Sequence, residues 1–100
     1  MSVKQLKDEL EAGTAQLFDV REPDEWAAGH LTQAISVPLS GLKENQLPDG
    51  LDKAKKTYLH CRSGRRVLTA KPLLDGMGFD DVVTLDEGYD ALVELGFEKA

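Results

Sequence analysis

A single cysteine follows a short apolar run and opens a turn rich in glycine, serine and arginine. The apolar run is 57–60, and residues 67–74 after the turn carry apolar side chains at helical spacing. This pattern predicts a buried strand, a tight turn and the start of a helix, with the thiol in the turn. The turn consists of Cys61, Arg62, Ser63, Gly64, Arg65 and Arg66.

Such a turn favours nucleophilic chemistry by the thiol. The first backbone N–H groups of a helix are unpaired, and the helix dipole adds partial positive charge there. Arg62, Arg65 and Arg66 add three full charges. A thiol in this setting ionises more easily than a free one, and the thiolate is the nucleophile. The same groups should hold an anion beside Cys61.

Alternating strands and helices are predicted around this turn. Because they alternate along the whole chain, we expect a three-layer α/β/α fold with a mostly parallel sheet of four to five strands, formed by one domain over 1–100. Ser2 and Gln5 have the spacing of a capping box at the start of the first helix. The expected helices are 3–12, 22–29, 65–76 and 87–96, with one or two helical turns in 39–47, and the expected strands are 16–21, 34–38, 57–60 and 81–85.

Composition excludes several classes of function. The 100 residues are 41% hydrophobic and 30% charged, which is ordinary for a soluble globular protein. No apolar run is long enough to span a bilayer, and the N-terminus lacks the apolar core of a secretory signal, so we expect a cytoplasmic protein without membrane partners. One cysteine forbids an internal disulfide, a multi-cysteine zinc site and a CxxC redox pair. We expect no metal.

The charge distribution favours a small anionic substrate. The net charge of −6 disfavours general nucleic-acid binding. The segment 53–66 nevertheless holds six cations and no acid. Its three lysines fit an ordinary solvated surface, whereas the arginines surround the thiol.

Several stretches, in this order along the chain, resemble the rhodanese family. Asp19-Val20-Arg21-Glu22-Pro23-Asp24-Glu25-Trp26, then Gly29-His30-Leu31 and 34–38, resemble its opening signature. His60-Cys61-Arg62-Ser63-Gly64-Arg65-Arg66 is similar to its active-site loop, and 79–88 to its closing strand and turn. The resemblance covers nearly the whole chain.

The resemblance implies sulfurtransferase chemistry of the thiosulfate sulfurtransferase type. Cys61 would attack the outer sulfur of a small anionic donor such as thiosulfate, sulfite would leave, and the resulting persulfide would pass its sulfur to cyanide or a thiol. No cofactor is implied. The N–H groups of residues 62–66 would stabilise both sulfur anions, with Gly64 allowing the loop its backbone angles and Ser63 able to donate a further hydrogen bond. Arg62 and Arg65 are candidates to hold the sulfonate of the donor, and Arg66 either joins them or only covers the surface.

Other polar residues near these motifs are interpreted as structural. Asp19 and Arg21 lie on one side of their strand, and we favour an ion pair that braces the next loop over a role at the rim of the substrate site. His30 is expected to be structural, and His60 to point away from Cys61 in a regular strand. Trp26 is expected to pack on the core. Pro72 lies inside a predicted helix, where proline is unfavourable. Leu92 stands where the family commonly has a tryptophan.

Three alternatives stay open to different degrees. A cysteine-based phosphatase or arsenate reductase would need an arginine six residues after the cysteine, where this chain has Val67. The domain could instead be a persulfide carrier with a protein sulfur acceptor, which the sequence does not separate from the enzyme. A catalytically silent binding module is disfavoured because Cys61 and its cationic loop are intact.

Overall fold

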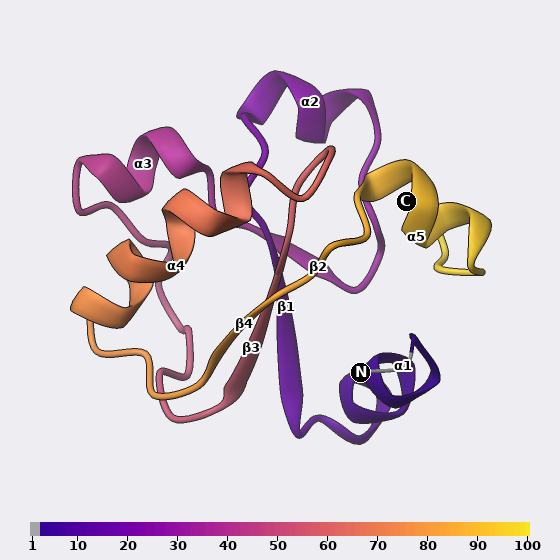
Figure 1. Ribbon diagram of the computed structural model, residues 1–100, viewed down its shortest axis with the longest axis horizontal. Helices are drawn as coiled ribbons and strands as arrows, with labels where there is room; N and C mark the ends of the chain where they lie inside the picture. Colours follow the sequence, from indigo (N-terminus) through magenta and orange to yellow (C-terminus); the bar gives the residue numbers. More distant parts are fainter. Residues whose placement is uncertain (1–2) are drawn as a thin grey trace.

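Four parallel strands form the centre of the protein, with helices on both faces of the sheet, in a computed structural model that describes residues 3–100 (Figure 1). Along the chain the elements are α1 (Val3–Ala12), β1 (Ala15–Asp19), α2 (Pro23–Ala28), β2 (Ala34–Ser36), α3 (Leu39–Lys43), β3 (Lys56–His60), α4 (Arg66–Gly76), β4 (Val82–Thr84) and α5 (Tyr89–Glu94).

The order of strands in the sheet is β2-β1-β3-β4, and every neighbouring pair is parallel. β1 and β3 therefore lie side by side in the middle, with Asp19 opposite His60 in the register. Because parallel strands end at the same edge, the last residues of β1 and β3 meet, and the chain continues from β3 directly into Cys61. The expected mostly parallel three-layer fold is confirmed, with four strands.

Alternating side chains of the two central strands separate two hydrophobic clusters. Phe18 and Leu59 face α3 and α4, where the cluster also contains Cys61. Leu17 and Tyr58 face the opposite side, which α1 and α5 cover (Figure 1). Successive strand residues point to opposite faces, so this alternation puts Cys61 on the α4 side and His60 on the other.

The predicted elements are present with shorter bounds in several places. The helix over 3–12 has the expected limits, whereas the strand expected over 16–21 ends at Asp19. It ends there because the Asp19 carboxylate accepts the backbone N–H of Arg21 at 2.9 Å, which turns the chain out of the sheet. The cap expected from Ser2 lies outside the described residues. Leu92, where a tryptophan is common, is fully buried in the cluster under α5.

The prediction that Trp26 packs on the core is wrong. Helix α2 buries none of its residues, and the Trp26 ring is only half-buried. It stacks on the ring of His30, with centroids 3.7 Å apart and an angle of 4° between the planes. Trp26 belongs to neither hydrophobic cluster, since α2 lies beyond the end of the sheet (Figure 1), and the two half-buried rings cover each other instead.

Within residues 3–100, no helix combines the length and the apolar character needed to cross a bilayer.

Helix α4 runs through Pro72 without a break. A proline in a helix interior removes one backbone hydrogen bond and crowds the preceding turn. Pro72 is exposed, so nothing in the core compensates for this cost. We expect Pro72→Ala to raise the free energy of unfolding by about 1–2 kcal/mol in urea denaturation.

The exposed Thr69 of the same helix provides the control, because Thr69→Ala changes only helix propensity, by about 0.5 kcal/mol or less. If Pro72→Ala gains no more than this control, Pro72 does not destabilise α4 as expected.

Candidate active site

Cys61 lies where β3 ends, at the base of the loop that leads into α4. Its side chain is fully buried. Burial by itself would raise the pKa of the Cys61 thiol. Hydrogen bonds from the backbone N–H groups of Ser63, Val67, Arg66 and Gly64 outweigh burial, and the pKa is lower than that of an ordinary thiol. The loop therefore favours the thiolate without a general base.

The segment after β4 holds this loop in place. The backbone N–H of Tyr89 donates to the carbonyl oxygen of Cys61 at 2.9 Å. A Cβ added to Gly88 would lie 1.8 Å from the carbonyl oxygen of Arg62, and one added to Gly64 would lie 2.8 Å from that of Asp86. Gly64 also has φ +79°, in the left-handed region that favours glycine. Two backbone segments thus touch directly, and the second one braces the nucleophile loop.

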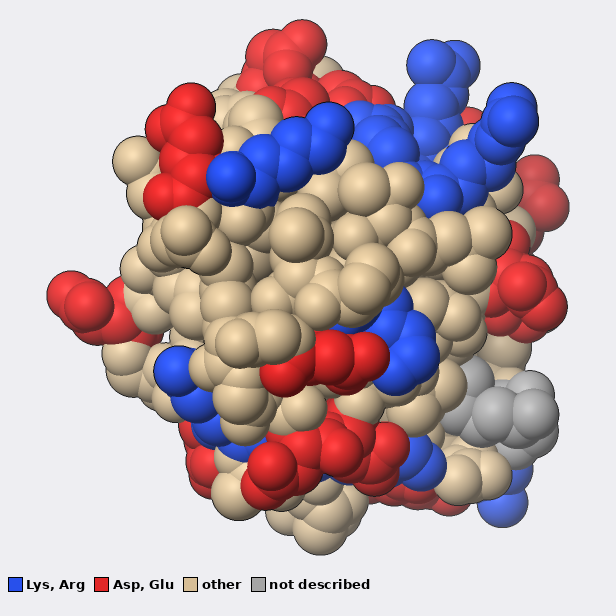
Figure 2. All heavy atoms as spheres, turned by 60° about the vertical axis from the view of Figure 1, so that its left-hand side comes forward, with Lys and Arg blue, Asp and Glu red and all other residues tan. Residues whose placement is uncertain are grey.

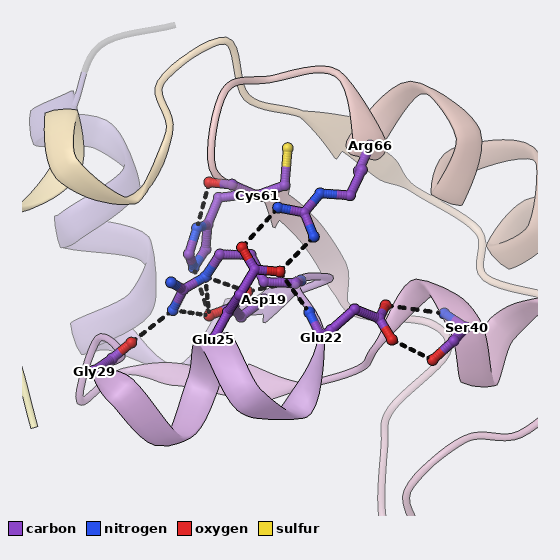
Figure 3. A network of polar contacts seen from close by, with 9 residues as sticks. Asp19, Glu22, Glu25, Gly29, Ser40, Cys61 and Arg66 are labelled. Atoms are coloured by element: carbon purple, nitrogen blue, oxygen red, sulfur yellow. Dashed lines mark hydrogen bonds and ion pairs between the residues drawn. The ribbon is translucent and has the colours of Figure 1, made fainter.

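The three loop arginines differ in their surroundings. Arg62 and Arg65 are exposed, and neither forms an ion pair with any residue in 3–100. Arg66 instead binds Glu25 of α2 through both guanidinium Nη atoms, at 2.6 and 2.9 Å (Figure 3). Hydrogen bonding from Arg66 lowers the pKa of Glu25 to about 2. Arg66 is therefore neither a free anion ligand nor a mere surface cover.

The predicted ion pair between Asp19 and Arg21 is present and buried. The two side chains meet at 2.8 Å, and Arg21 Nη2 also donates to the carbonyl oxygen of Gly29 at 2.7 Å (Figure 3). The guanidinium carbon lies 4.2 Å from the centroid of the Tyr89 ring. These contacts tie the end of β1 to the loop after α2 and to α5, which is the bracing role expected from the sequence.

Neither histidine contacts the thiol. His60 is fully buried, with Nδ1 3.4 Å from the Cys61 carbonyl oxygen and Nε2 3.7 Å from Asp19. Burial lowers the pKa of His60 despite the opposing charge of Asp19, so the ring is neutral at pH 7. His30 Nδ1 lies 2.9 Å from the Trp26 carbonyl oxygen, in the stacked pair on α2.

The sequence matches the model of the rhodanese-like domain over residues 2–95. The chain belongs to the rhodanese-like family. A structure of the human single-domain sulfurtransferase TSTD1 has a TM-score of 0.80 and 26% identity to this rhodanese-like domain, over 94% of each chain. The family and the fold predicted from the sequence are both confirmed.

Two bacterial relatives are closer in sequence to this rhodanese-like domain. Protein slr1261 of Synechocystis, named as uncharacterized, is 39% identical over 80 residues, which make up 80% of this chain and 44% of that protein. YtwF of Bacillus subtilis, named "Putative sulfurtransferase", is 36% identical over 83 residues, 82% of this chain and 79% of that protein. The chain thus spans less than half the length of the Synechocystis relative.

Two parts of this site do not follow from the sequence. Glu25 belongs to the opening signature, but no neighbouring residue indicates a role for it, and its contact with Arg66 spans 41 positions in the chain. Gly88 belongs to the closing turn, and only the close approach of Arg62 shows why a glycine is needed there. Gly88 itself is the one signal in the sequence that indicates the contact with Arg62.

Gly88→Ala should disrupt the loop, because the new methyl group would collide with backbone atoms of Arg62 rather than with a flexible side chain. We expect a loss of about 2–3 kcal/mol in the free energy of unfolding, measured in urea. Alkylation of Cys61 at pH 7 should slow as the N–H groups move away from the thiolate.

Gly76→Ala is the matched control, since a Cβ there meets nothing within 4 Å and Gly76 ends a helix. It should leave the alkylation rate unchanged. Equal stability and equal alkylation rates for the two alanine variants would show that Gly88 does not brace the loop.

Proposed function

We propose that this rhodanese-like domain moves a sulfane sulfur from thiosulfate or a similar donor to cyanide or a thiol, through a persulfide on Cys61. The observation that carries the proposal is the buried cysteine between the end of β3 and the start of α4, whose thiol has its pKa lowered by backbone N–H groups of the loop. Such an arrangement suits a centre whose charge stays on sulfur before and after the transfer.

In the first step the Cys61 thiolate attacks the outer sulfur of thiosulfate. A new S–S bond forms, the S–S bond of the donor breaks, and its electron pair leaves with sulfite. In the second step cyanide or a thiolate attacks the outer sulfur of the persulfide and leaves as thiocyanate or as a new persulfide. The electron pair of the cleaved S–S bond returns to Cys61, so the cycle needs no cofactor.

In this proposal the loop 61–66 binds the sulfur donor. The N–H groups of Ser63, Gly64, Arg66 and Val67 stabilise the thiolate and then the outer persulfide sulfur. Arg62 and Arg65 are exposed and unpaired within 3–100, which leaves them able to attract the sulfonate end. Basic side chains project together at one end of the face drawn in Figure 2, while acidic side chains gather around much of the rest.

A phosphatase function has less support. Val67 stands six residues after Cys61, where a phosphate-clamping arginine would be needed, and its side chain is 1% exposed. The nearest arginine, Arg66, is bound by Glu25.

A second candidate is a persulfide carrier that hands its sulfur to a protein thiol. The observation in its favour is Leu68, a large apolar side chain that is 65% exposed on the first turn of α4, three residues after the exposed Arg65. An apolar contact beside a cation suits a protein partner better than cyanide. Rapid cyanide turnover unaffected by Leu68→Asp, with no faster protein acceptor, would argue against the carrier.

The proposal predicts a specific change of mass. After incubation with thiosulfate and removal of excess donor, the intact protein should be heavier by one sulfur atom. Because Cys61 is the only cysteine, Cys61→Ala should gain nothing, and a reducing thiol should remove the added sulfur from the wild type. No added mass with any sulfane donor, together with hydrolysis of an aryl phosphate, would overturn the proposal.

A further inference from the structure

An internal carboxylate occupies the anion-binding edge of a loop arginine. Glu25 places one oxygen on each Nη of Arg66, in the bidentate arrangement shown in Figure 3. The planar guanidinium fork fits two oxygens of a carboxylate, a phosphate or a sulfate in the same way. Glu25 therefore takes the place that two oxygens of a tetrahedral anion would otherwise occupy.

Arg66 lies beside the nucleophile. It is the first residue of α4, and its backbone N–H is one of the four that lower the pKa of the Cys61 thiol. The charge of Cys61 raises the pKa of Arg66, after the larger effect of hydrogen bonding to Glu25. The Arg66 guanidinium is near enough to feel the charge of Cys61, so an anion held there would add a second negative charge near the thiolate and disfavour its formation.

Glu25 is itself held in place. Its Oε1 accepts the backbone N–H of Glu22 at 3.1 Å. The carboxylate of Glu22 accepts the backbone N–H of Ser40 at 3.2 Å and its hydroxyl at 2.5 Å (Figure 3). Arg66 and Glu25 nevertheless keep 31% and 26% of their side-chain surface exposed, so dissolved anions can reach the pair.

We propose that Glu25 is a specificity-determining residue, which excludes tetrahedral oxyanions from Arg66 and reserves the loop for a single sulfur atom on Cys61. The inference deepens the proposed function and rests on it for the identity of the reacting sulfur. Exclusion also assists the reaction, because the departing sulfite finds no bidentate partner and is attracted only by Arg62 and Arg65 at the surface.

The exclusion does not depend on pH over the working range of the protein. With a pKa of about 2, Glu25 stays ionised at every pH above about 4. Arg66 stays protonated, with a pKa that Glu25 raises further. The two charges therefore remain paired wherever Cys61 is able to react.

Protection of Cys61 against alkylation tests this inference with sulfate and inorganic phosphate as probes. Iodoacetamide is neutral, so it reports the reactivity of Cys61 without competing for the arginines, and the alkylated fraction is read from intact mass. Each protein is compared with its own rate without anion. We expect the half-protecting anion concentration to fall about tenfold in Glu25→Ala, the gain from one charge-assisted bidentate contact.

If circular dichroism shows that Glu25→Ala does not fold, Glu25→Gln replaces it in the experiment. Glutamine keeps the side-chain volume and one hydrogen-bond acceptor and removes the charge. A smaller fall in the half-protecting concentration, at least about threefold, is expected there. The double variant E25A/R66A should lose the gain, since the site that binds the anion is then absent.

Asp24→Asn is the matched control, because it removes an exposed negative charge next to Glu25 on α2 and leaves the contact between Glu25 and Arg66 in place. Its half-protecting concentration should stay at the wild-type value. Equal protection in wild type and both Glu25 variants would overturn the inference, as would an equal gain in Asp24→Asn. Alkylation needs no sulfur transfer, so these results are independent of whether a persulfide forms.

Discussion

A negative charge on a buried sulfur is the constraint on which this structure depends. Cys61 has no exposed surface, and burial without partners would keep its thiol protonated and unreactive. Four backbone N–H groups compensate the charge because the loop bends around the sulfur and continues into α4. Backbone groups supply fixed dipoles that need no rearrangement when charge passes to an outer sulfur.

The surrounding elements keep those N–H groups in position. The parallel sheet brings the end of β3 beside the end of β1, where the Asp19–Arg21 pair ties down the following loop. The turn after β4, which is distant in sequence, brings Gly88 into contact with the backbone of Arg62. At the other end of the loop, Glu25 links α2 to the first residue of α4. Strand, loop and helix are thus fixed from three sides.

Much of this arrangement could be predicted from the sequence because it depends on local pattern. The alternation of elements indicates the layers, and the apolar run before Cys61 identifies the strand that presents it. The position of Val67, counted along the chain from Cys61, also distinguishes this loop from a phosphate loop. Each of these inferences needs only the order of neighbouring residues.

Contacts between distant segments could not be predicted in this way. The contact between Arg66 and Glu25 has no signal in the sequence, because the two residues lie 41 positions apart and the packing of α2 is not encoded in its periodicity. Large aromatic side chains are usually buried, which predicts a core position for Trp26, but α2 lies over the end of the sheet and Trp26 stacks on the ring of His30. In both cases tertiary geometry determined the partner.

The pKa of Cys61 tests most directly whether backbone N–H groups activate the thiol. It can be titrated by the ultraviolet absorbance of the thiolate, in the wild type and in a double variant that replaces Arg62 and Arg65 by alanine. The account predicts a midpoint below that of a free cysteine titrated in the same way, in both proteins, because the four N–H groups remain in the variant. A wild-type midpoint at or above that value, or a return to it in the double variant, would contradict the account.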